Sequence, residues 1–226
     1  HQHESILETT IHSQSDELPG GYFQSKWVNE NIIELARKKG IPINVYRIGD
    51  VKGDSENGMG DPQNFGNLVM QYFISRGVAI DWDIPEFNFI PVDYLAKAIA
   101  CISTVQTNQT FQFSNPELIS FNDIYEAAIT AGHNIQLTDK QEWMSILRSE
   151  NSRLGKLLKP IFKSFTPDPT VGQTSFYQIG VDMFSKKHDT TNTALALKGS
   201  GIICPAMLAD GILEKYLTHL GKVLSH

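Results

Sequence analysis

The chain has 226 residues, of which 41% are hydrophobic and 19% are charged, and its formal net charge at pH 7 is −6. This balance is typical of a globular protein and excludes a disordered or fibrous chain. The negative charge and the lack of any run of Lys or Arg argue against a nucleic-acid-binding protein.

The two cysteines, Cys101 and Cys204, are too few for a disulfide framework and lack zinc-ligand spacing, so we expect no metal site. Both suit buried thiols in a reducing cytoplasm. No apolar run reaches the ~20 residues that span a bilayer, and the polar start is not a signal peptide. We therefore expect a cytoplasmic protein without a membrane partner.

The first nineteen residues mix a short apolar patch with polar residues and end in a loop signal. The stretch from Gly20 to Gly40 then predicts a helix over about 22–39, because basic residues and a glycine close it. One face of this helix is predicted to be apolar, since these side chains recur at helical spacing: Trp27, Val28, Asn31, Ile32 and Leu35.

Tyr22 and Lys26 are four residues apart, so a helix places both side chains on one face. An ammonium group beside a phenol favours the phenolate, which suits a tyrosine that gives and takes a proton. The same spacing is also common on solvated helix faces, where it has no catalytic role.

The apolar run at about 43–48 predicts a buried strand, and a helix followed by such a strand is typical of a doubly wound sheet. Ligands of such sheets lie beyond the carboxyl ends of the strands, so the glycine-rich turn at 47–54 is a candidate cofactor site. A connection without any ligand is the alternative. No Gly-x-Gly-x-x-Gly phosphate-binding loop occurs in the chain.

Helix and strand patterns continue to alternate: a helix that stops at Gly77, a strand at about 87–90, a helix at about 92–104 and a strand at about 110–115. Asp93 is expected to cap the helix that it begins. Ser120 or Asn122 is expected to cap the next helix, and a short strand and two helices follow. The second of these is cationic and is better explained as a cover for the core than as a membrane-binding helix.

The tail contains two short helices. Asn192 or Thr191 is expected to cap the first, which stops at Gly199. Pro205 is expected at the first position of a last helix over about 206–220.

The motif Gly-Tyr-x-x-Ser-Lys-Trp-x-x-Glu resembles the active-site helix of the extended short-chain dehydrogenase/reductase family: Gly21, Tyr22, Ser25, Lys26, Trp27 and Glu30. The tail Asp-x-x-Asn-Thr…Gly-Ile-x-Cys-Pro is similar to that of thioester reductases. These are the terminal reductase domains of nonribosomal peptide and polyketide synthases and of carboxylic acid reductases. Nucleotide-sugar epimerases do not share this tail. The similarity extends from Tyr22 to about Leu220.

The resemblance implies NADPH-dependent reductive release of a carrier-bound acyl or peptidyl thioester, as an aldehyde or, after a second reduction, an alcohol. Tyr22 and Lys26 would be catalytic and would also bind the cofactor. The backbone at Ile48, Gly49 and Val51, within an Arg-x-Gly-x-x-x-Gly segment, would face the nicotinamide. The expected partners are a phosphopantetheinyl carrier protein domain and the N-terminal half of the same reductase domain, which would carry the phosphate loop upstream of His1.

We accordingly expect an α/β fold: the second half of a Rossmann-like doubly wound sheet over 1–115, and a mostly helical subdomain for substrate or carrier over 116–226. The third member of the catalytic triad is expected upstream of His1, with Thr9 and Thr10 as alternatives at a closer spacing. The isolated chain is expected to be inactive. Two other functions stay open: a non-catalytic carrier-docking module, and an extended short-chain nucleotide-sugar epimerase or dehydratase.

Overall fold

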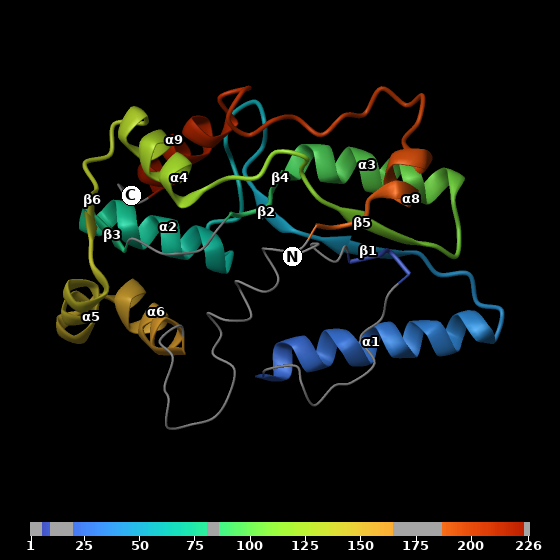
Figure 1. The fold of residues 1–226 in the computed structure, drawn as a ribbon, viewed down its shortest axis with the longest axis horizontal. Helices are drawn as coiled ribbons and strands as arrows, with labels where there is room; N and C mark the ends of the chain where they lie inside the picture. Colours follow the sequence, from blue (N-terminus) through green and yellow to red (C-terminus); the bar gives the residue numbers. More distant parts are fainter. Residues whose placement is uncertain (1–5, 10–19, 81–85, 165–186, 224–226) are drawn as a thin grey trace.

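The computed structural model describes residues 6–9, 20–80, 86–164 and 187–223. All the strand pairs among these residues are parallel, and helices surround them (Figure 1). Parallel neighbours need long crossovers, which explains why helices separate the strands along the chain. The pairs are β1 (Val45–Ile48) with β5 (Thr110–Phe113), β2 (Asp50–Lys52) with β4 (Phe89–Pro91), and β3 (Val78–Ile80) with β6 (Gln136–Thr138). The predicted α/β class is confirmed.

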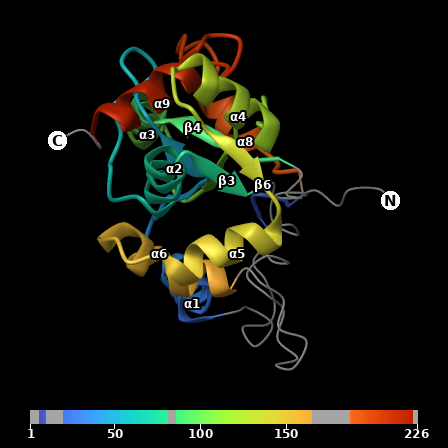
Figure 2. The ribbon, with the colours of Figure 1, turned by 90° about the vertical axis from the view of Figure 1, so that its left-hand side faces the viewer.

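The helices largely follow the sequence pattern. They are α1 (Gly20–Lys38), α2 (Phe65–Arg76), α3 (Val92–Val105), α4 (Phe121–Thr130), α5 (Lys140–Ser149), α6 (Arg153–Ser164), α8 (Thr191–Ala196) and α9 (Ile212–Val223). Helix α1 lies on one side of the β1–β5 pair, and α3 and α8 lie on the other (Figure 1). Figure 1 and Figure 2 both show α5 and α6 on the side of the molecule opposite α4 and α9.

Strands β1 and β2 form one path that bends at Gly49. A Cβ at Gly49 would lie 3.2 Å from Ile90 Cδ1 and 3.3 Å from Asn88 Oδ1, so the bend suits glycine. The Asn88 side chain donates to the Asn115 carbonyl oxygen (3.0 Å), which joins the end of β5 to the start of β4. The turn predicted at 47–54 is therefore partly strand, because residues 50–52 form β2 and pair with β4.

Lys52, the last residue of β2, has a fully buried side chain. Its Nζ lies 2.8 Å from Asp50 Oδ2, and 4.5 Å and 5.8 Å from the ring centres of Phe89 and Tyr216. A buried ammonium group needs such compensation because it has lost its hydration. The contact with Tyr216 attaches this strand path to α9.

Two of the predicted helix boundaries depend on local signals and are confirmed. Gly77 ends α2 in the left-handed conformation with φ of 64°. Ser120 caps α4 and forms a capping box with Asp123, in which each side chain bonds the other residue's backbone amide.

Two predictions about the tail were wrong. The residue that precedes α8 is Thr190, which makes no side-chain cap bond. The Thr191 amide donates instead to Asp189, and the Asn192 and Thr193 amides donate to Glu8. The last helix begins at Ile212 rather than near Pro205. Gly211, with φ of 64°, separates it from an earlier turn, because the left-handed conformation cannot continue an α-helix.

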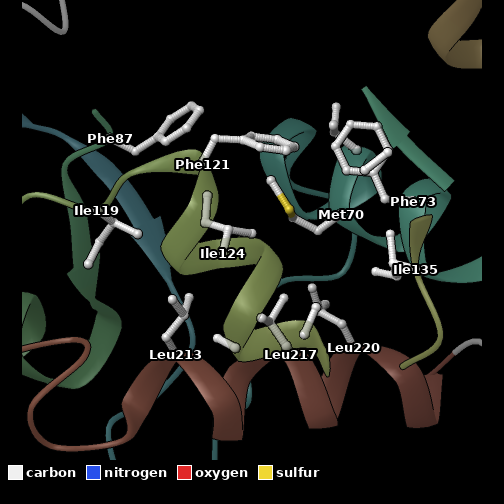
Figure 3. Packing of buried hydrophobic residues seen from close by; sticks show 14 of the residues in the cluster. Met70, Phe73, Phe87, Ile119, Phe121, Ile124, Ile135, Leu213, Leu217 and Leu220 are labelled. Atoms are coloured by element: carbon white, nitrogen blue, oxygen red, sulfur yellow. The ribbon is translucent and has the colours of Figure 1, made fainter. Parts of the chain in front are cut away.

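Apolar side chains form two clusters. The larger one joins α2, α4, α5 and α9, and Figure 3 shows Leu213, Leu217 and Leu220 of α9 facing α4 and Met70 of α2. The smaller one packs α3 against the strands: Ile90, Tyr94, Leu95, Ala98, Ile102, Phe111, Phe113 and Leu197. Segments from both sides of residue 115 contribute to each cluster, and the division of the chain at that residue stays a prediction.

A buried carboxylate connects α2 to the turn between α5 and α6. Glu150 Oε2 accepts hydrogen bonds from Tyr72 Oη (3.0 Å) and from the Arg76 guanidinium. Burial alone would raise the pKa of Glu150, but hydrogen bonds from Arg76 and Ser152 outweigh it and lower the pKa to about 2. Burial and the neighbouring carboxylate raise the pKa of Tyr72 to about 12.

The loop between β2 and α2 contacts α9 through backbone atoms. Gly58 has φ of 73°, and a Cβ there would lie 2.3 Å from the Lys215 carbonyl oxygen. Gly132 has a similar φ of 88°, but a Cβ there would meet nothing within 4 Å. The two glycines therefore share a backbone conformation and differ in the space around them.

We expect Gly58→Ala to destabilise the protein more than Gly132→Ala. Each substitution should cost about 1 kcal/mol for its positive φ, and Gly58→Ala a further 1–3 kcal/mol or so for the collision with α9. Urea unfolding of both variants measures the difference. Equal losses of free energy would show that this loop does not contact α9.

We also expect stability to fall in acid through Glu150. Its pKa is lower in the folded protein, so its contribution is fully present above pH 4.5, the ordinary value, and is lost as the pH falls towards 2. The contribution is on the order of 3 kcal/mol. In Glu150→Gln, the difference in unfolding free energy from the wild type should shrink between pH 5 and 2. A constant difference would contradict the assignment.

Candidate functional site

The tyrosine and lysine of the sequence motif lie together at the start of α1. Lys26 Nζ is 5.5 Å from the centre of the Tyr22 ring, and 66% of Tyr22 is exposed. The Phe23 ring meets the Tyr22 ring edge-on at 5.4 Å. The predicted placement on one face is confirmed, and the exposed phenol is accessible to a ligand.

Ser25 of the same motif has a local structural role. Its Oγ donates to the Tyr22 carbonyl oxygen at 2.7 Å, within the helix. The hydroxyl therefore supports the first turns of α1, next to Lys26 and three residues after Tyr22.

The apolar face predicted for α1 is largely exposed. Val28 is 44% exposed, Ile32 57% and Leu35 60%, and none of residues 21–38 is fully buried. These three side chains follow helical spacing, so they form one stripe along the helix. Trp27 and Asn31 of the predicted face are half-buried, so in the described part of the chain this face is packed only along one side.

Polar contacts attach the end of α1 to the strands. The Arg37 guanidinium donates to the carbonyl oxygens of Ile43 (2.8 and 3.0 Å) and Gln109 (2.7 Å) and to Thr110 Oγ1 (3.2 Å). It also pairs with Glu34 Oε1 at 2.6 Å. This arginine thus joins the last turns of α1 to the residues that precede β1 and β5.

A second ion pair joins the middle of α1 to β1. Arg47 Nε donates to Glu30 Oε1 (2.9 Å) and Nη2 donates to Glu30 Oε2 (2.6 Å). Both side chains are mostly buried, with 19% and 26% exposed. Two parallel hydrogen bonds fix the direction as well as the distance between the partners. The sequence motifs contain both residues, but nothing in them indicated that the two would meet.

The three residues predicted to face the cofactor follow Arg47 directly. Ile48 ends β1 and is 44% exposed, Gly49 forms the bend, and Val51 is half-buried in β2. Among the described strands, β1 pairs with β5 alone, which leaves its other edge without a strand partner. Glu30 and Arg47 thus connect the segment that carries Tyr22 and Lys26 to the segment that carries these residues.

Thr9 lies at a different place. It lines a polar cavity of about 310 Å³ between α1 and the first residues of β1 and β5, with Glu30, Glu34 and Arg37. Tyr22 and Lys26 are not among the residues that line it. The structure therefore does not bring Thr9 to the tyrosine, and Thr10 lies outside the described residues.

Asp93 anchors a loop and does not cap α3, which corrects the prediction. The residue that precedes α3 is Pro91, and no side chain caps this helix. Asp93 Oδ1 accepts from Ser55 N (3.0 Å), and Oδ2 accepts from Ser55 Oγ (2.8 Å) and Lys97 Nζ (3.1 Å). Burial alone would raise the pKa of Asp93, but these hydrogen bonds outweigh it and lower the pKa.

The tail motif that begins at Asp189 holds the segment before α1. Glu8 is 2% exposed, and its carboxylate accepts from the backbone amides of Gln112 (2.9 Å), Asn192 (2.6 Å) and Thr193 (3.4 Å). The Asn192 side chain meanwhile donates to the Thr110 carbonyl oxygen at 3.0 Å. These residues of the motif thus have a structural role. Asp189 accepts from the Thr191 amide, and a carboxylate 184 residues away caps the Asn192 amide.

In the part of the chain that the structure describes, no group of three or more His, Cys, Asp or Glu residues could hold a metal ion. Among the same residues, no helix has both the length and the apolar character needed to cross a membrane.

Comparison with known proteins relates the chain to reductases. Residues 1–99 match the NAD-binding family described as male sterility protein. The chain is 30% identical over 148 residues to a subunit of the linear gramicidin synthase of Brevibacillus parabrevis, in an alignment that covers 65% of this chain and 3% of that protein. It is 26% identical over 203 residues to the isonitrile lipopeptide synthase of Streptomyces coeruleorubidus, covering 88% of this chain and 13% of the synthase.

Solved structures also align with most of this chain. The terminal R domain from the myxalamid PKS-NRPS pathway aligns with a TM-score of 0.77 and 26% identity, over 97% of this chain and 54% of that one. UDP-glucose 4-epimerase of Thermotoga maritima aligns with a TM-score of 0.52 and 14% identity, over 88% and 52%, which shows the fold alone. The chain thus spans about half of these solved chains and a small part of the synthases.

The contact between Asp93 and Ser55 predicts which amides depend on this carboxylate. In Asp93→Asn, we expect the Ser55 amide to exchange with solvent roughly tenfold faster, since hydrogen bonds to charged groups contribute about 1.5–3 kcal/mol. Amides in the first turn of α3 should exchange as in the wild type. Hydrogen exchange measures both sets of amides. Faster exchange in the first turn of α3, with an unchanged Ser55 amide, would show that Asp93 caps this helix.

Proposed function

We propose that this chain, a member of the extended short-chain dehydrogenase/reductase family related to terminal reductase domains, is the C-terminal part of a domain that reduces a carrier-bound thioester. The observation that carries the proposal is the Tyr22–Lys26 pair at the exposed start of α1. It stands in a chain that is 26% identical to a solved terminal R domain over 97% of its length. The substrate class is an acyl or peptidyl thioester on a phosphopantetheinyl carrier protein domain.

In the proposed reaction, Tyr22 donates a hydrogen bond to the thioester carbonyl oxygen and then its proton as that oxygen gains negative charge. Lys26 stabilises the resulting phenolate and binds the ribose hydroxyls of the cofactor. NADPH supplies the hydride. The product of this addition is a hemithioacetal, which breaks its carbon–sulfur bond to release an aldehyde and the thiol of the carrier. A second reduction would give the alcohol.

The residues of this chain suit the nicotinamide end of NADPH. Ile48 is exposed, and the strand edge at β1 has no partner among the described strands. Backbone groups at such an edge are available to hydrogen-bond a ligand. The phosphates would be held elsewhere, since the sequence contains no phosphate-binding loop.

The partner for this cofactor end is proposed to be the N-terminal half of the reductase domain. The exposed stripe of Val28, Ile32 and Leu35 supports this proposal, because a large apolar surface usually packs against protein. The free edge of β1 offers a place for a further strand. Residues 116–226 would bind the substrate or the carrier.

The test compares the complete gene product with this chain by NADPH titration and by thioester reduction. We expect the complete product to bind NADPH and reduce a carrier-bound thioester, and this chain alone to do neither. Tyr22→Phe should lower kcat by about 100-fold or more, because it removes the proton donor. Tyr125→Phe is the control, since Tyr125 packs in α4 against the larger apolar cluster.

Other outcomes would identify the alternatives. A complete product that binds a carrier protein but not NADPH would be a docking module. Turnover of a nucleotide sugar instead of a thioester would make it an epimerase or dehydratase.

A further inference from the structure

Arg47 touches three segments that the proposed reaction depends on. It belongs to β1, immediately before Ile48 and Gly49. Its Nε and Nη2 donate to the Glu30 carboxylate on α1, and its Nη1 donates to the Leu7 carbonyl oxygen (3.2 Å). Leu7 precedes Glu8, which is fastened to α8 and β5. One guanidinium therefore connects the helix, the strand and the segment that leads into the helix.

The position of Glu30 on α1 makes this contact relevant to Tyr22 and Lys26. Glu30 lies four residues after Lys26, one turn along the helix, and eight after Tyr22. A helix is stiff over two turns, so the place of its carboxylate sets the place of the two side chains before it. Val28, Ile32 and Leu35 are exposed and no side chain among residues 21–38 is fully buried, so directional polar contacts matter for fixing the helix here.

We propose that Glu30 and Arg47 are positioning residues that hold Tyr22 and Lys26 in register with the strand segment Ile48–Val51. The inference rests on the proposed function, because that register matters where the tyrosine and the cofactor must meet. The two parallel hydrogen bonds between a carboxylate and a guanidinium are directional, so they allow little movement of α1 along β1. Reacting groups displaced by about 1 Å can lose roughly 100-fold in rate.

The chain offers a matched control for this pair. Glu34 lies one turn after Glu30 on the same helix and also pairs with an arginine, Arg37, at 2.6 Å. Arg37 keeps its bonds to the carbonyl oxygens of Ile43 and Gln109 when Glu34 is changed. Glu34→Gln therefore removes a similar charge pair without releasing the helix from the strands.

The experiment uses the complete gene product, with Glu30→Gln, Glu34→Gln and Arg47→Lys. We expect Glu30→Gln to lower kcat by about 10- to 100-fold and the KM for the thioester to change by less than about threefold. Arg47→Lys keeps the charge but loses the paired geometry, so we expect it to be impaired as well. Glu34→Gln should retain the kcat of the wild type.

A second readout does not depend on turnover. Without cofactor, amide hydrogen exchange over residues 22–30 should be faster in Glu30→Gln than in Glu34→Gln. Equal exchange over 22–30, equal kcat in the two glutamine variants, or a wild-type kcat in Arg47→Lys would each overturn the inference. An inactive wild type would instead refute the proposed function, and the exchange comparison would still test the link between helix and strand.

Discussion

Two arginines fix the position of α1, a helix in which no side chain among residues 21–38 is fully buried. Arg37 donates to carbonyl oxygens at the start of the strands, and Arg47 pairs with Glu30 two turns after Tyr22. Apolar packing depends mainly on the area buried and is not directional, whereas these bonds require one geometry. The helix can therefore leave its apolar stripe exposed and still present a defined pair of side chains.

Local signals predicted much of the fold. Gly77 and the Ser120–Asp123 box act within one helix turn, so the residues themselves specify where α2 and α4 begin or end. Two of the predictions that were wrong concern groups with partners distant in sequence. The position of Asp93 predicts a helix cap, but its carboxylate accepts a hydrogen bond from Ser55, 38 residues earlier. Two free amides of α8 are capped by Glu8, which no local pattern identifies.

The candidate site likewise has one feature that sequence spacing predicts and one that it does not. Helical spacing predicts that Tyr22 and Lys26 share a face, and the structure has them adjacent. The ion pair between Glu30 and Arg47 joins residues 17 positions apart across a turn, so it depends on how α1 and β1 pack together. Sequence spacing specifies what one element presents, and it does not specify which elements meet.

The carboxylate of Glu8 also constrains the order of folding. Its hydrogen-bond donors include backbone amides 184 and 185 residues later. A carboxylate is costly to bury before such donors exist. Closing a loop of this length carries an entropic cost that only late contacts repay. The segment around Glu8 therefore docks after α8 has been synthesised, so this edge of the candidate site is assembled among the last steps of folding.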